Sequence, residues 1–276
     1  MQHTENIATN FFNYFRESQY GQNLKTKIRF GIYKPAEMAN EEYTKILGVD
    51  TNNLNHMPLC RGIASAFCKN NEYLPIHTEV LKDANLLHDI GEAFSKDEIK
   101  GFKTKEGEKK EIAGYQFILD KFAKEKNIHL QDYNYLKYLA DNVIYNTNTL
   151  IGRAFNTIER IGYLRTGLTA FDKSQDTSYD QKFRANLEWL TLNVVYQEIT
   201  PLIIRTHGYP AVGNYLQENK KRISNVFDSL NVNEISKLYL TLESEKNKLP
   251  TDLSRKDYVS VDHFQKSKYD WKNFAR

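Results

Sequence analysis

The stretch Leu86-Leu87-His88-Asp89-Ile90-Gly91-Glu92 places an imidazole directly before a carboxylate. In the run that leads into it, residues 80–87, apolar side chains recur with the spacing i, i+1, i+4 and i+7. This spacing is typical of a helix that packs one face against a core. His88 and Asp89 therefore follow a buried helical face, where packing can fix the geometry of two side chains that both bind divalent metals.

Two further acids follow the His-Asp pair. A helix is expected over residues 79–93. Glu92 lies four residues after His88, so it faces the same cavity if this helix continues past the His-Asp pair. Gly91 weakens the end of such a helix. Asp97 is therefore expected beyond the helix, on a loop at the mouth of the cavity.

The pattern His-Asp-x-x-Glu-x-x-x-x-Asp after Leu-Leu resembles the HD-domain phosphohydrolases. Within that superfamily it is most similar to the bacterial 5'-deoxynucleotidases and their relatives, and the similarity covers about residues 25–175. The resemblance implies an all-α HD-domain helical bundle. It also implies one divalent metal ion, held by an upstream His, the His-Asp pair and a downstream Asp, and catalytic roles for Glu92 and Asp97.

The upstream ligand is expected near the start of an earlier helix. His56 lies 32 residues before His88, ahead of an apolar run, and Asn53 or Asn55 is a suitable cap for its helix. His77 is the competitor, but it lies only 11 residues before His88 and reads as part of the loop that enters the same helix. His56 is therefore the predicted ligand.

The downstream ligand departs from the family pattern. Asn156 stands where the resembling helix, over residues 150–168, carries an Asp. An amide oxygen can coordinate a metal but brings no charge, so the affinity for the metal is expected to fall. Asp141, after Ala140, is the alternative, although the sequence after Asn156 fits the family better. The predicted metal ligands are thus His56, His88, Asp89 and Asn156.

The resemblance implies metal-assisted hydrolysis of a nucleotide, by an enzyme of the 5'-nucleotidase or dNTP phosphohydrolase type. The metal would be Mn, Co, Mg, Fe or Zn, and Lys103 and Arg29 would neutralise phosphate oxygens. The base and the number of phosphates stay open. Because Asn156 brings no charge, the alternative is a nucleotide-binding or interaction protein that keeps the HD fold but has lost hydrolysis.

Composition predicts a soluble, cytoplasmic protein. A chain of 276 residues with 40% hydrophobic residues can bury one large helical core, and the net charge of +3 is too small to indicate a nucleic-acid surface. The sequence shows no signal peptide and no apolar run long enough for a membrane span, and its two cysteines read as small apolar fillers.

Two regions are expected along the chain. Residues 1–175 form the predicted HD phosphohydrolase domain, and residues 176–276 form a helical extension packed on it, which serves as a cap or as the contact of a homo-oligomer. A polar stretch after Phe171 marks the boundary between the two. Residues 100–110, with two glycines and several lysines, are expected to form a basic mobile loop.

Overall fold

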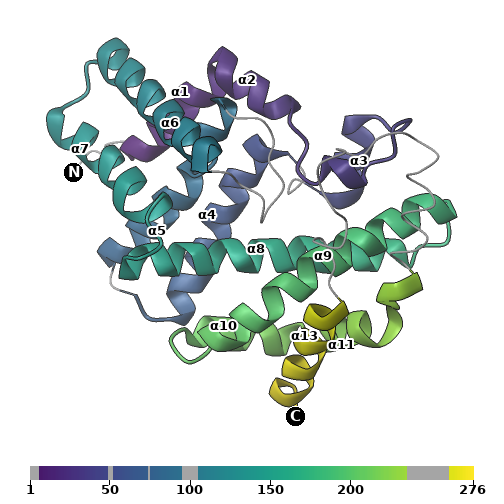
Figure 1. Ribbon diagram of the computed structural model, residues 1–276. Helices are drawn as coiled ribbons and strands as arrows, with labels where there is room; N and C mark the ends of the chain where they lie inside the picture. Colours follow the sequence, from purple (N-terminus) through teal and green to yellow (C-terminus); the bar gives the residue numbers. More distant parts are fainter. Residues whose placement is uncertain (1–5, 49–51, 74, 95–104, 235–260) are drawn as a thin grey trace. The chain divides into compact units, whose positions relative to one another are not determined.

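The computed structural model describes residues 6–48, 52–73, 75–94, 105–234 and 261–276 (Figure 1). All regular structure in these residues is helical, apart from one isolated antiparallel bridge between Ile28 and Asn52. The expected all-α fold class is confirmed. None of the described helices is long and apolar enough to cross a membrane.

The chain divides into two compact units at different places from those expected. The first unit comprises residues 1–31 and 48–159, and the second comprises residues 32–47 and 160–276. The second boundary falls inside helix α8 (Leu150–Ser174), before the polar stretch that ends this helix. A boundary within a continuous helix is not marked by linker residues such as Gly, Pro or Ser. The sequence therefore favoured the polar stretch near residue 175 as the boundary.

The first unit is built around neighbouring helices near the His-Asp pair. In Figure 1, α4 and α5 lie side by side, and contacts also join α1 to α5 and α6 to η3. Ser18 ends α1 and caps α2, so these two helices follow one another without a loop. Besides the start of α8, the elements are α1 (Ile7–Glu17), α2 (Gln19–Thr26), α4 (Asn53–Asn70), α5 (Pro75–Leu87), the 3-10 helix η3 (Ile90–Phe94), α6 (Lys105–Lys126), α7 (Leu130–Leu139) and the π-helix η4 (Ala140–Ile144).

Asp83 connects four segments of the first unit. Its carboxylate on α5 is only 1% exposed. It accepts hydrogen bonds from Asn6 Nδ2 at 3.1 Å and from Tyr135 Oη at 2.9 Å, and it lies 3.5 Å from Arg61 Nη2. Asn6 caps α1, Arg61 belongs to α4 and Tyr135 to α7. One buried carboxylate therefore fixes α5 against three other helices.

The stability of the fold is expected to depend on pH through Asp83. Burial raises the pKa of this carboxyl above its ordinary value of 3.8, although its hydrogen bonds and the Arg61 charge act in the opposite direction. The folded chain thus holds this proton more tightly than the unfolded chain, and the contribution of Asp83 to stability falls as the pH rises above 3.8. Asp83→Asn cannot titrate, so urea unfolding at a series of pH values should give a flatter curve just above that value. Parallel curves for the two proteins would show that the pKa is not raised.

The second unit is organised around α9 (Gln181–Arg205). Residues 189–196 of this helix are all buried, so α9 is covered on every side rather than along one stripe. Within the unit α13 packs against α9, and α10 and α11 also contact it. Asn219 separates α10 from α11. The other elements are α3 (Asn40–Leu47), α10 (Pro210–Glu218), α11 (Lys220–Ser229), α13 (Val261–Phe274) and most of the 3-10 turn η1 (Gly31–Tyr33).

Candidate functional site

The His-Asp pair lies in a turn rather than in a helix. Helix α5 ends at Leu87, so His88 and Asp89 follow its last turn, and Glu92 lies on η3. The backbone N–H of Glu92 donates to the carbonyl oxygen of Asp89 at 3.0 Å, a three-residue spacing that marks the tighter helix. The expected continuous helix over residues 79–93 is therefore wrong in its last part, although Glu92 remains close to the pair.

Gly91 allows η3 to approach α6 closely. A Cβ atom at this position would overlap the backbone oxygen of Glu111 and would lie 2.5 Å from the Tyr145 hydroxyl. Because the obstacle is partly backbone, it cannot be relieved by turning a side chain. The glycine thus sets the position of the acids on either side of it, Asp89 and Glu92.

Gly91→Ala is expected to destabilise the protein by about 1–3 kcal/mol, the usual cost of forcing extra volume into a packed interior. Gly62→Ala is the matched control, because Gly62 is exposed on α4 and a Cβ there meets nothing within 4 Å. This second change should raise stability by up to about 1 kcal/mol, the helix preference of alanine over glycine. Chemical unfolding of both variants measures the difference, and equal stability would contradict the close approach.

His56 and His88 are brought together from α4 and from the turn after α5. Their ring centroids lie 5.3 Å apart, and the two residues are 4% and 6% exposed.

Asn52, rather than Asn53 or Asn55, caps α4, because its side chain accepts hydrogen bonds from the backbone N–H groups of Leu54 and Asn55. The rival ligand His77 is exposed on the first turn of α5, where its ring faces Tyr73.

Cys60 belongs to the same cluster, which the sequence did not predict. Its Sγ lies 3.0 Å from His56 Nε2, and the residue is fully buried. One potential ligand atom from each of His56, Cys60 and His88 lies within 4.8 Å of the other two. Ligand atoms of a tetrahedral ion at 2.0–2.3 Å lie about 3.3–3.8 Å apart, so these three side chains would close in by about 1 Å to hold one metal. The spacing i, i+4 from His56 was the available signal.

The orientation of His88 leaves one nitrogen for a metal. Its Nδ1 lies 2.8 Å from the backbone carbonyl oxygen of Asn85. A carbonyl can only accept a hydrogen bond, so Nδ1 carries the proton. In the neutral imidazole Nε2 then bears the lone pair, and a backbone acceptor of this kind is the usual means by which a metal-binding histidine is held.

Asp89 contacts both His88 and Arg29. Its Oδ1 lies 3.1 Å from His88 Nε2, and its Oδ2 accepts a hydrogen bond from Arg29 Nη1 at 3.0 Å. Both side chains of the Arg29–Asp89 ion pair are at most 10% exposed. Arg29, predicted as a phosphate ligand, is thus positioned beside the predicted metal ligand.

The first turns of α8 provide the other side of the cluster. The Phe155 ring lies 6.0 Å from the His88 ring, and Glu159 Oε1 lies 3.9 Å from His88 Nε2. Asn156 is half-buried on the same helix, three residues before Glu159.

Asp141, the alternative to Asn156, is exposed and pairs with Lys137 at 2.9 Å. Glu159 is therefore an acid near His88 that the sequence interpretation missed.

Glu92 is held at both its side chain and its backbone. Asn53 Nδ2 donates to Glu92 Oε2 at 2.6 Å, and Asn53 itself is only 2% exposed. The Lys27 ammonium donates to the backbone oxygen of Glu92. Asp97 and Lys103, the other predicted catalytic and phosphate-binding residues, lie outside the described part of the chain, as do residues 100–104 of the expected basic loop. Residues 105–110 form the first turns of α6, so the loop prediction is wrong for this part.

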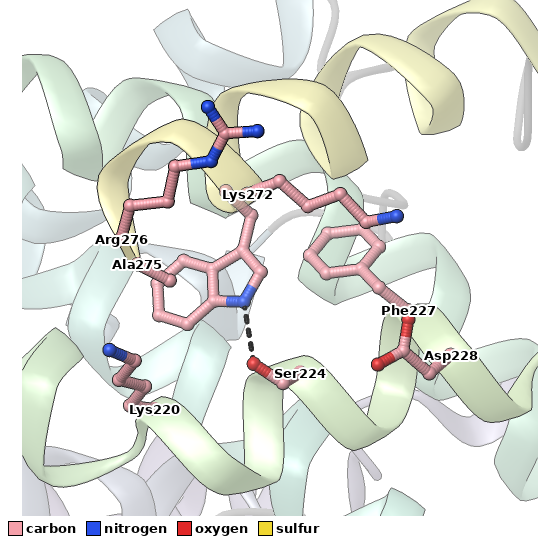
Figure 2. A pocket seen from close by; sticks show the side chains of 8 residues that line it. Lys220, Ser224, Phe227, Asp228, Lys272, Ala275 and Arg276 are labelled. Atoms are coloured by element: carbon pink, nitrogen blue, oxygen red, sulfur yellow. Dashed lines mark hydrogen bonds between the residues drawn. The ribbon is translucent and has the colours of Figure 1, made fainter.

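The second unit contains a cavity of about 200 Å³ between α11 and α13 (Figure 2). The Trp271 indole N–H donates to Ser224 Oγ at 3.0 Å and joins the two helices there. None of the predicted site residues lines this cavity. Its lining residues are Lys220, Ser224, Phe227, Asp228, Trp271, Lys272, Ala275 and Arg276.

Comparison of the chain with protein-family models, with curated protein sequences and with solved structures found no match. The function is therefore inferred from the side chains described above. They comprise two buried imidazoles, a thiol in contact with one of them, and a carboxylate paired with an arginine.

Proposed function

We propose that this chain is a divalent-metal-dependent phosphohydrolase that releases phosphate or triphosphate from nucleotides, with deoxynucleotides as the first class to test. The observation that carries the proposal is the buried pair of His56 and His88, with Asp89 3.1 Å from the second imidazole. Two neighbouring buried imidazoles, with a carboxylate beside one of them, offer ligand types that suit a divalent cation. The resemblance of the His-Asp-x-x-Glu-x-x-x-x-Asp pattern supplies the reaction class.

His56, His88 and Asp89 would hold the cation, and Asn156 is the fourth ligand of the proposal. When bound, the cation would polarise a phosphoryl oxygen and lower the pKa of a water molecule. Arg29 fixes one oxygen of Asp89 and leaves the other beside His88. The cluster is thus preorganised by contacts that need no ligand.

Glu92 would accept the proton of the attacking water. The Asn53 amide donates to its Oε2 at 2.6 Å, which holds the carboxylate in place beside the His-Asp pair. Asp97 would orient the water or the sugar hydroxyl, and Lys103 would neutralise phosphate oxygens, with a lesser contribution from Arg29. The roles of Asp97 and Lys103 rest on the resemblance alone.

A nucleotide panel tests the proposal. The metal-free chain is loaded with Mn²⁺, Co²⁺, Mg²⁺, Fe²⁺ or Zn²⁺ and offered mono- and triphosphates of all four deoxynucleosides and of the ribonucleosides. Free phosphate and free triphosphate are then measured separately. We expect metal-stimulated release of one of these products, with chelation abolishing it. Release that survives chelation would contradict a metal-dependent reaction.

The second candidate function is a nucleotide-binding protein that has lost hydrolysis. It is favoured by the uncharged Asn156 and by the Arg29 ion pair, which already occupies one oxygen of Asp89. This alternative predicts saturable nucleotide binding without turnover and with little metal in the purified protein. Calorimetry on the same panel, beside metal analysis, separates it from the enzyme.

The cytoplasm is the proposed location of the protein. Cys60 and Cys68 are both buried, and neither forms a disulfide. Reduced cysteines of this kind suit a compartment where glutathione and thioredoxin keep thiols reduced.

A further inference from the structure

Cys60 is placed on α4 so that its sulfur shares the space between two imidazoles. It lies one helical turn after His56, on the same face, and its Sγ is 3.0 Å from His56 Nε2. The potential ligand atoms of the His56, Cys60 and His88 group all lie within 4.8 Å of one another, and all three residues are buried.

We infer that Cys60 is a thiolate ligand of the metal, together with His56 and His88. This inference rests on the metal site of the proposed function and adds the sulfur to it. When the metal binds, a sulfur–metal bond forms and the thiol proton leaves to the solvent, because the thiolate is the form of cysteine that coordinates. The oxidation state of the metal does not change.

The thiolate supplies the negative charge that Asn156 lacks. His56, His88 and Asn156 are neutral ligands, and the charge of Asp89 is shared with the Arg29 guanidinium 3.0 Å away. A thiolate next to two imidazoles restores an anionic ligand set. It also changes which metals are favoured, since thiolate ligands prefer zinc, ferrous iron or cobalt over magnesium, calcium or manganese, which prefer oxygen.

Cobalt is the probe that tests this inference, because a cobalt–thiolate bond gives a charge-transfer band in the near ultraviolet that nitrogen and oxygen ligands do not give. The chain has two cysteines, so each single variant keeps one identified thiol. Cys68→Ser leaves Cys60, and Cys60→Ser leaves Cys68, which is also buried on α4 two turns further on. Both variants and the wild type, prepared metal-free, are titrated with Co²⁺ while absorption and bound cobalt are measured.

The inference predicts one cobalt per chain and a thiolate band in the wild type and in Cys68→Ser. The band is lost in Cys60→Ser. The affinity for cobalt falls there by more than roughly 10–100-fold, which is the loss expected for a residue that only contacts a metal ligand. Because the band in Cys68→Ser identifies Cys60 by itself, the test stands even if Cys60→Ser does not fold. The protons released when cobalt binds are a second measurement, and Cys60→Ser should release one proton fewer per bound metal than the wild type.

Cobalt bound at one per chain without a thiolate band in Cys68→Ser would overturn the thiolate ligand and leave the metal-dependent hydrolase intact. No cobalt binding in any of the proteins would overturn both the thiolate ligand and the metal site. Phosphate release is measured separately on the same cobalt-loaded samples. A failure of the thiolate ligand is therefore distinguished from a failure of the proposed hydrolase activity.

Discussion

His88→Ala is expected to remove the metal and to reduce phosphate release to the level of the metal-free protein. His88 has close neighbours from three segments of the chain: its ring lies against those of His56 and Phe155, and its Nε2 lies 3.1 Å from Asp89 and 3.9 Å from Glu159. The hydrogen bond from His88 Nδ1 to the Asn85 carbonyl oxygen directs Nε2 toward the cluster, and the substitution removes this ligand nitrogen. Metal per chain and phosphate release are measured on the same sample, with circular dichroism as the test of folding.

His77→Ala is the matched control for this experiment. His77 lies on the same helix that leads to His88, but it is exposed and faces Tyr73. Its removal should change neither the metal content nor the rate. A folded His88→Ala protein that keeps its metal and its turnover would show that the cluster is not the active centre.

Glu92→Ala is expected to lose turnover while keeping the metal. A group that transfers a proton acts mainly in the transition state, and such groups typically contribute about 10²–10⁴-fold to the rate. The fall should therefore appear in kcat and in kcat/KM together, with nucleotide affinity little changed. Steady-state kinetics, metal analysis and nucleotide titration of the same variant provide the three readings.

Glu79→Ala serves as the control, because this glutamate on α5 is half exposed and pairs only with Lys82 at 2.8 Å among the ion pairs of the described chain. It should behave like the wild type. If Glu92→Ala empties the metal site, Glu92 is a ligand and the proposed division of labour is wrong. If it turns over at the normal rate, the base lies elsewhere.

Local patterns predicted much of the first unit. The helical spacing before His88 and the acids after it are properties of the chain itself, and they predicted α5. The choice of His56, on α4, came from the family resemblance. The end of α5 was harder to predict, because it depends on how closely η3 packs against Glu111 and Tyr145 around Gly91. Those neighbours are distant in sequence, so no local pattern contains them.

The same reasoning explains what was missed in the site. Cys60 looked like an apolar filler, since only the approach of His88 from another segment gives its sulfur a second imidazole. The pairing of Arg29 with Asp89 joins residues 60 apart in the chain. The family pattern marks Asn156 and not Glu159, although both lie on one face of α8 and Glu159 is the acid near His88.

The second unit was less accessible to prediction. Helix α13 buries only Phe264, Ser267 and Trp271 among many polar residues, which leaves a weak apolar pattern in the sequence. The short helix α3 groups with the C-terminal residues, a long-range association that composition does not reveal. The fold class was therefore predictable, whereas the division into units was not.

Titrating the metal-free chain with metal while recording turnover shows whether the buried imidazole cluster is the metal centre of a phosphohydrolase. The substrate is the best nucleotide of the panel, and each addition is a fraction of one equivalent. Phosphate release should rise in proportion to the added metal and stop rising at one equivalent per chain. Turnover that is present before any metal is added, or absent at every level of metal, would contradict it.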